Sequence, residues 1–208
     1  MKKTTTAIRV WDAPTRVFHW LLVFSFAGAY LTSESERWSL VHITLGYTLG
    51  GLIAFRLIWG FVGTRYARFT SFVKGPLEVL QYAKSMATLN PKHFVGHNPL
   101  GAVAIVLLIV SGIAIVVTGY AAFNEIGGEW VAELHEVSSH IILILVGVHI
   151  VGVIAASWLH KENLARAMVN GLKQGKVADG ISRVWVSVAA LLLAVVLGYW
   201  YLQWAPLG

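Results

Sequence analysis

The charged residues of this 208-residue chain are unevenly spread and leave five long apolar stretches. Each stretch runs for at least 17 residues without Asp, Glu, Lys or Arg, over residues 17–33, 38–55, 94–124, 137–160 and 184–208. A hydrocarbon core about 30 Å thick requires about 20 apolar residues in an α-helix. The pattern therefore predicts an all-α integral membrane protein with five transmembrane helices, of which the second continues past Arg56 to residue 62.

The composition agrees with a membrane protein. Hydrophobic residues make up 57% of the chain and charged residues 12%, about half the charged share of a soluble domain. We do not expect the first stretch to be a signal peptide, because it begins only after residues 11–14 and lacks a small-residue cleavage site. We expect a four-helix domain at residues 1–175 and an additional C-terminal transmembrane helix at residues 176–208.

The connecting segments alternate in charge, and this alternation predicts the orientation. Nearly all Lys and Arg residues lie before the first helix, between the second and third, or between the fourth and fifth. The opposite side has Arg37 and six carboxylates, at Glu34, Glu36, Glu125, Glu129, Glu133 and Glu136. The positive-inside rule then places the N-terminus in the cytoplasm and the C-terminus on the outer side of the membrane. Because the net charge of +6 is divided among three membrane-flanking segments, we expect no nucleic-acid partner.

The longest connection, residues 63–97, contains one further helical signal. Gly75-Pro76 precedes an apolar spacing of Leu77, Leu80, Ala83 and Met86, which predicts a short helix with Pro at its first position. This helix either lies along the inner membrane surface or is an ordinary soluble helix.

The chain has no cysteine. This excludes disulfides, iron–sulfur clusters, thiolate ligands and covalent c-type haem attachment. A redox cofactor would therefore have to be held by imidazole.

Histidines recur at two depths of the predicted bundle. His135 and His149 are fourteen residues apart, which is within about 40° of four helical turns and a rise of about 21 Å, so both face the same side. His42 lies near the outer end of the second helix, at the depth of His135. His19 is fifteen residues from Glu34, and His149 is sixteen from Glu133, so these two also share a depth. The result is an outer pair and an inner pair.

Ionisable residues inside a membrane are candidates for function. Two imidazoles that face each other across a bundle suit the two axial positions of haem, whereas zinc would require further ligands at the same depth. Taken singly, each histidine could instead make a helix–helix hydrogen bond, and each glycine could serve close packing. The matched pairs favour ligation, and Gly46 and Gly50 follow His42 at one-turn intervals and leave room for a flat ring.

Other residues near the inner pair have candidate roles. Arg16, Arg56 and Arg65 could contact haem propionates or a quinone, although an arginine that extends to the interface is an alternative for Arg56. His97 is the candidate donor to a quinone head group. His93, His140 and His160 are expected to have ordinary interface roles.

Several motifs together resemble the bacterial cytochrome b561 and Ni,Fe-hydrogenase b-type cytochrome family over residues 8–175. They are RVWDAPTRVFHW, VHITLGY, RLIWGFVGTRYARF, GHNPLG, LHE and VGVHIVG. The resemblance implies two haem b groups, with His19 and His149 on the inner iron and His42 and His135 on the outer. The fifth predicted helix departs from the simplest four-helix relatives. It is expected to pack outside the haem bundle, and its role is open.

A haem with two histidine ligands has no open iron position, so single-electron transfer is the expected activity. The resemblance implies a bacterial inner membrane, with the C-terminus in the periplasm. It also implies transfer between the quinone pool and a periplasmic redox protein, either a c-type cytochrome or a hydrogenase. One alternative is a quinone-linked oxidoreductase that oxidises superoxide, but the six outer carboxylates would repel that anion. A transporter with histidine proton relays, which would bind no haem, is another. Homo-oligomer formation is left open.

Overall fold

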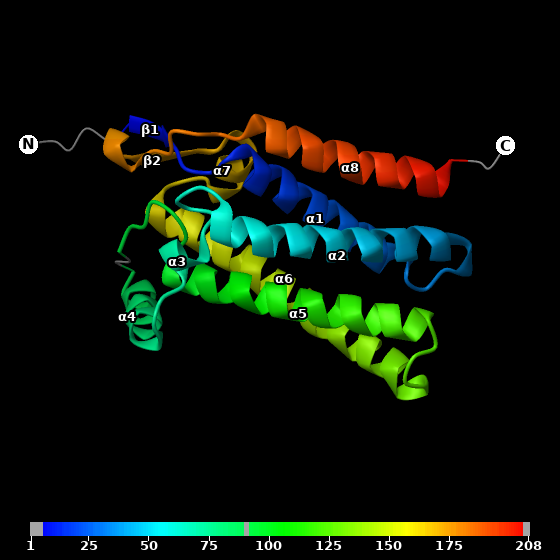
Figure 1. The fold of residues 1–208 in the computed structure, drawn as a ribbon. Coiled ribbons are helices and arrows are strands. Elements are labelled where there is room, and N and C mark those ends of the chain that lie inside the picture. The colour runs from blue at the N-terminus through cyan, green and yellow to red at the C-terminus, as the bar shows by residue number, and fades with distance from the viewer. Residues whose placement is uncertain (1–5, 90–91, 206–208) are drawn as a thin grey trace, which may run out of the picture.

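The computed structural model describes residues 6–89 and 92–205. Five long helices run side by side in it: α1 (Ala13–Thr32), α2 (Ser39–Val62), α5 (Pro99–Phe123), α6 (Glu129–His160) and α8 (Val186–Trp204). Figure 1 shows them as a bundle with a cluster of short elements at one end. The prediction of an all-α integral membrane protein is confirmed, with two short strands added to it.

Among the described residues, four helical segments are long and apolar enough to cross a membrane. They are Glu36–Val62, Pro99–Phe123, Glu129–His160 and Val186–Trp204. The 20-residue α1 falls outside this set because Pro14, Thr15, Arg16 and His19 lower the hydropathy of its first turns. It still packs along α2, and the antiparallel pair is joined by the short 3-10 helix η1 (Glu36–Trp38).

Helix α6 begins at Glu129, eight residues before the start that the charge-free run predicts. Glu133, His135 and Glu136 are therefore helical residues. At the other boundary, α5 begins only at Pro99, where the side chain of Asn98 accepts a hydrogen bond from Gly101 N at 2.8 Å. The helix boundaries thus follow capping chemistry where it is present, and charge marks them less accurately.

A buried carboxylate joins the start of α1 to the end of α2. Asp12 caps α1 by accepting from Thr15 N at 2.8 Å, and its other oxygen accepts from Trp59 Nε1 at 3.1 Å and Thr64 Oγ1 at 2.6 Å. Since Asp12 is 1% exposed, these three donors replace the water that the charge would otherwise require. This contact fixes how the first two helices meet.

The helix α8 packs on the outside of the bundle, as predicted. Its neighbours are α1 and α2, and it lies on the far side of α1 from α5 (Figure 1). Val196 is buried among Phe18, Leu21 and Leu52, and Trp200 Nε1 donates to Thr48 Oγ1 at 2.9 Å. Helix α8 therefore contacts α1 and α2, the helices that contain His19 and His42.

The short elements gather at one end of the bundle, which we call the basic end. They are α3 (Phe69–Phe72), α4 (Pro76–Ala87), α7 (Leu164–Asn170), the 3-10 helix η2 (Val177–Asp179), and strands β1 (Thr6–Arg9) and β2 (Leu172–Gly175). The predicted short helix is confirmed as α4, which begins at Pro76. The opposite end, with η1 and the turn at residues 124–128, is the acidic end.

The two strands were not predicted. They pair antiparallel, with Thr6 opposite Gly175 and Arg9 opposite Leu172, so the N-terminal segment is fastened to the chain that follows α7. Gly171, just before β2, has φ +80°, and a Cβ there would stand 2.7 Å from the carbonyl oxygen of Trp11. Only glycine meets both conditions.

Candidate functional site

The clearest candidate site lies toward the acidic end, where α2 and α6 bring two histidines together. The rings of His42 and His135 lie close together and nearly perpendicular, with their centroids 6.3 Å apart and their planes at 87°. We call them the acidic-end pair. They are 93 residues apart in the chain, and the depth count along the predicted helices is what placed them at one level.

Both rings of the acidic-end pair are oriented by the backbone. His42 Nδ1 donates to Ala29 O at 2.8 Å, and His135 Nδ1 donates to Ile115 O at 3.0 Å. Thr118 Oγ1, which donates to Ala114 O, lies 3.2 Å from His135 Nδ1. With the proton on Nδ1, each Nε2 has a free lone pair, which is the usual state of a histidine that binds a metal.

Glycines shape the space around this pair in different ways. A Cβ at Gly119 of α5 would stand 2.8 Å from Cε1 of His135, so this glycine lets the ring lie against α5. At Gly46, a Cβ would meet no atom of the described residues within 4 Å, so the helix face after His42 is open. Gly50 differs, because a Cβ there would come within 3.0 Å of Val116 Cγ1. Gly46 thus leaves space near His42, while Gly50 permits close packing of α2 on α5.

His19 of α1 and His149 of α6 form the basic-end pair. They are the two histidines that the depth count predicts at the inner level. The ring of His19 is edge-on to Trp20, with centroids 5.2 Å apart. In the part of the chain that the structure describes, His19 Nδ1 is buried without a hydrogen-bond partner, so this nitrogen could still form a hydrogen bond.

His97 lies just before α5, partly buried between two aromatic rings, with its Nδ1 fully enclosed. Its centroid is 4.5 Å from that of Trp11 and 4.6 Å from that of Phe72. Burial first, and then repulsion from Arg56 and Lys173, lowers the pKa of His97 to about 3, so the imidazole is neutral near pH 7. No atom of residues 6–89 or 92–205 hydrogen-bonds its buried Nδ1.

Arg56 lies close by, and it does not extend to solvent. It is 4% exposed, and its guanidinium carbon lies 4.7 Å from the centroid of Phe69 and 5.8 Å from that of Phe72. Its Nη1 is also unpartnered among the described side chains and backbone. Phe72 is thus shared by two buried groups, Arg56 and His97, that can each donate a hydrogen bond.

The family model of the prokaryotic cytochrome b561 matches residues 10–171 of this chain. The chain belongs to this family. As a member it is a multi-pass membrane cytochrome of the b type, which transports electrons and binds haem b.

Relatives of this cytochrome have more specific names. A probable Ni/Fe-hydrogenase B-type cytochrome subunit of Rhizobium leguminosarum bv. viciae is 25% identical over 79% of this chain and 88% of its own length. A protein with the same name from Azotobacter vinelandii is 27% identical over 82% of this chain and 90% of its own length. The probable Ni/Fe-hydrogenase 1 B-type cytochrome subunit of Escherichia coli (strain K12) is 26% identical over 56% and 60% of the two chains. No solved structure matches this cytochrome.

The acidic-end pair of the cytochrome fits haem. A metal–imidazole bond of about 2 Å on each side, with the ring radii added, separates two axial rings by about 6 Å. The observed 6.3 Å agrees with this, and the Nδ1 bonds leave the ligating nitrogens free. Among the described residues no three His, Asp or Glu side chains come together as a metal site, so the candidate ligand sets are pairs of histidines. Bound haem supplies one-electron chemistry, while the protein orients its axial ligands and excludes water.

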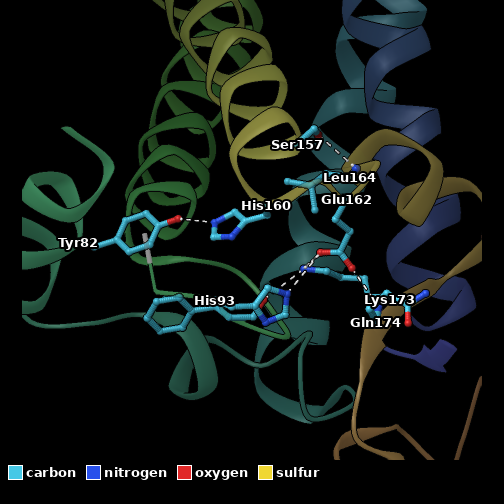
Figure 2. A network of polar contacts seen from close by, with 9 residues as sticks. Tyr82, His93, Ser157, His160, Glu162, Leu164, Lys173 and Gln174 are labelled. Atoms are coloured by element: carbon cyan, nitrogen blue, oxygen red, sulfur yellow. Dashed lines mark hydrogen bonds and ion pairs between the residues drawn. The ribbon is translucent and has the colours of Figure 1, made fainter. Parts of the chain in front are cut away.

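The remaining candidates of the cytochrome have other contacts. Arg16 Nη1 donates to Val169 O at 2.5 Å and Nε to Asp12 O at 3.4 Å, so this side chain already fastens α1 to α7. His140 Nδ1 donates to Glu136 O at 2.9 Å on the exposed side of α6. His93 and His160 take part in a polar network at the basic end, shown in Figure 2.

Sequence reasoning missed the other members of that network, Tyr82, Glu162 and Lys173. Lys173 Nζ lies 3.2 Å from Glu162 Oε2 and is nearly buried. In the sequence, Lys173 lies between Gly171 and Gly175, and Glu162 follows Lys161, so both resemble ordinary charged residues of a loop. The signal that could have found Lys173 is its inward position in β2, which becomes visible only once β1 is paired with it.

Proposed function

We propose that this cytochrome holds two haem b groups and passes electrons through the membrane between a periplasmic redox protein and the quinone pool. His42 and His135 would ligate one iron, and His19 and His149 the other. The single observation that supports this most strongly is the position of His42 and His135, whose ring centroids are 6.3 Å apart while both Nδ1 atoms donate to backbone carbonyls. Six-coordinate irons leave no position for substrate, which favours an electron-transfer subunit.

The rise between His135 and His149 supports two separate haem levels. Fourteen residues of continuous helix span about 21 Å, which is too far for one haem to use both. Of the two groups near the basic-end level, Arg56 is the better donor to a haem propionate, because it is buried and no described carboxylate pairs with it. Arg16 is a second candidate, with two of its donors already bound to carbonyls. Gly46 would give the acidic-end haem its open helix face.

The ends of the bundle would meet different partners. The positive-inside rule places the basic end in the cytoplasm. His97 would donate to a quinone oxygen there, because its buried Nδ1 has no partner among the described residues. The acidic end would then face the periplasm, and its exposed Glu34, Glu36, Glu129 and Glu133 suit a basic protein surface.

The names of the relatives favour a hydrogenase as this periplasmic partner. A c-type cytochrome is the other candidate of the same kind. Oxidation of superoxide is not favoured, because the exposed carboxylates over the acidic-end pair would repel an anion.

Haem analysis of the purified full chain tests the ligand assignment. We expect two haem b per chain with low-spin spectra, and the loss of one haem in His135→Ala and of the other in His19→Ala. His140→Ala, a histidine five residues from His135 whose Nδ1 bonds within its own helix, is the matched control and should retain both. A His135→Ala protein with unchanged haem content would refute the pairing.

A further inference from the structure

The polar network at the basic end centres on Glu162, which follows α6. Three donors converge on its carboxylate: Gln174 N at 3.0 Å, Lys173 Nζ at 3.2 Å and His93 Nε2 at 3.7 Å. Figure 2 shows His93 and Lys173 reaching the carboxylate from different segments of the chain. His93 from a loop and two residues of strand β2 thus approach the carboxylate of Glu162, which follows α6.

Exposure falls from one side of this network to the other. The side chain of His93 is 46% exposed, that of Glu162 is 11% exposed and that of Lys173 is 4% exposed. The three therefore form a series from water to the interior, which we call the proton entrance. His160 and Tyr82 lie beside it: the rings of His93 and His160 are 5.6 Å apart, and Tyr82 Oη is 3.2 Å from His160 Nε2.

The buried end of the proton entrance contacts the segment that leads to His97. Lys173 Nζ donates to Phe94 O at 3.2 Å, three residues before His97, and its charge is near enough to act on that imidazole. The other titratable side chains whose charges act on His97 are Arg56, His19 and His149. His97 is thus within electrostatic reach of both Lys173 and the basic-end histidine pair.

We propose that His93, Glu162 and Lys173 conduct protons from the cytoplasm to a quinone that is reduced beside His97. This inference rests on the proposed function. Reduction of a quinone to a quinol takes two electrons, which the basic-end haem would deliver from the periplasmic partner, and two protons. Two O–H bonds form on the quinone. The neutral His97 ring gives each proton from Nδ1 as it takes another at Nε2, and that second proton comes through Lys173 and Glu162 from water at His93.

The chemistry of the three groups suits this transfer. The Nδ1 of His97 is buried, so a quinone oxygen bound to it would receive protons through titratable side chains. Burial lowers the pKa of Lys173, and Glu162 opposes the shift, so the lysine releases a proton more readily than an exposed one. A contact that served stability alone would have little use for such a pair, because desolvation offsets the attraction between buried charges.

Glu162→Gln in the full, haem-loaded cytochrome is the direct test, because glutamine keeps the shape of the side chain and cannot carry a proton. In vesicles that contain a pH-sensitive dye, an artificial donor would reduce the haems and a short-chain benzoquinone would accept the electrons. We expect proton uptake and quinone reduction to slow by about tenfold or more, with a larger solvent deuterium isotope effect. Haem reduction by the donor should keep its rate, and Glu162→Asp should restore proton uptake.

Glu78→Gln is the matched control, since Glu78 is an exposed carboxylate of α4 at the same end. Infrared difference spectra give a readout apart from turnover: quinone reduction should shift a carboxyl band that Glu162→Gln lacks and Glu78→Gln retains. Equal proton uptake in the two variants would overturn the proton entrance and leave the proposed function intact. A wild-type cytochrome that reduces no quinone would overturn both.

A surface variant covers the case in which Glu162→Gln does not fold. His93→Gln changes a half-exposed side chain and should slow proton uptake most at high pH, where protons are scarce. Added imidazole should restore the rate, as expected when a missing proton carrier is replaced from solution. If His93→Gln takes up protons at the wild-type rate across the pH range, the proposal is wrong.

Discussion

Gly119 lies directly against the imidazole of His135, and a Cβ at residue 119 would stand 2.8 Å from Cε1 of that ring. The same ring donates through Nδ1 to Ile115 O, one helical turn before Gly119. Helix α5 therefore holds the Nδ1–Cε1 edge of His135 at two places, although it contributes no histidine to the pair. The position of the proposed outer haem depends on this contact.

Gly119→Ala should displace His135 and weaken the outer haem. Alanine raises the intrinsic helix stability by about 1 kcal/mol, so a loss of haem could not be attributed to a weaker α5. We expect the absorbance of one of the two proposed haems to fall while the other is retained. Gly147→Ala is the control, because a Cβ at Gly147 in α6 meets no described atom within 4 Å. Equal haem spectra in the two variants would contradict this role of Gly119.

Asp12→Ala should destabilise the junction of α1 and α2. The change removes a helix cap and leaves Trp59 Nε1 and Thr64 Oγ1 without their buried acceptor. We expect a loss of about 3 kcal/mol in the free energy of unfolding, read as a lower midpoint of thermal unfolding in detergent.

Asn163→Ala is the control that measures the loss of a helix cap alone, without the loss of a buried junction. Asn163 caps α7 at the surface through Arg166 N at 2.7 Å, so its loss should cost about 1 kcal/mol. If the two variants unfold at the same midpoint, the junction at Asp12 contributes no more than a cap does.

Arg56 should raise the potential of the inner haem, because a buried positive charge favours the reduced form. With an effective dielectric constant of about 20, removal of the charge in Arg56→Gln should lower the midpoint potential by about 50–100 mV. Arg56→Lys keeps the charge and should shift it less. In a spectroscopic redox titration, the exposed Arg68→Gln should leave both potentials unchanged, because its charge is screened by solvent. An equal shift for Arg56→Gln and Arg68→Gln would show that Arg56 does not act on the haem directly.

The sequence was sufficient for the long helices and for the meeting of His42 with His135. Charge-free runs mark spans because the membrane excludes charge, and a helix has a fixed rise, so depth can be counted along each run. The early start of α6 at Glu129 was missed because the helix extends beyond the apolar run, where carboxylates face water. Helix α1 shows that hydropathy alone is also an incomplete guide, since it is a 20-residue helix of lower hydropathy than the four candidate spans of the described chain.

The basic end was far less predictable. Strands of four residues give no periodic signal, so the pairing of β1 with β2, 163 or more residues apart, could not be seen. The contacts of Lys173 follow from that pairing, and the surroundings of His97 follow from how residues 63–89 and 92–98 fold over the bundle. Short polar segments of this kind are fixed by tertiary contacts, and their composition does not reveal those contacts.

Acid should weaken the basic end through His97. The pKa of His97 in the fold is about 3, against 6.5 for an exposed histidine, because burial disfavours the charged ring. As the pH falls below 6.5, the unfolded segment binds a proton that the folded one refuses, so stability is lost progressively down to about pH 3. At pH 4.5 the difference amounts to about 3 kcal/mol, and it is absent above pH 6.5.

Limited proteolysis of the segment around residue 97, followed between pH 8 and pH 4.5, measures this opening. Wild-type protein should become more sensitive below pH 6.5, whereas His97→Phe, which keeps an aromatic ring between Trp11 and Phe72, should change much less. The exposed His140→Phe serves as the control and should follow the wild type, because His140 bonds only within α6 in the described structure. The same acid response in His97→Phe and in the wild type would show that another group governs the basic end, and that the burial of this imidazole imposes no proton-linked cost on the fold.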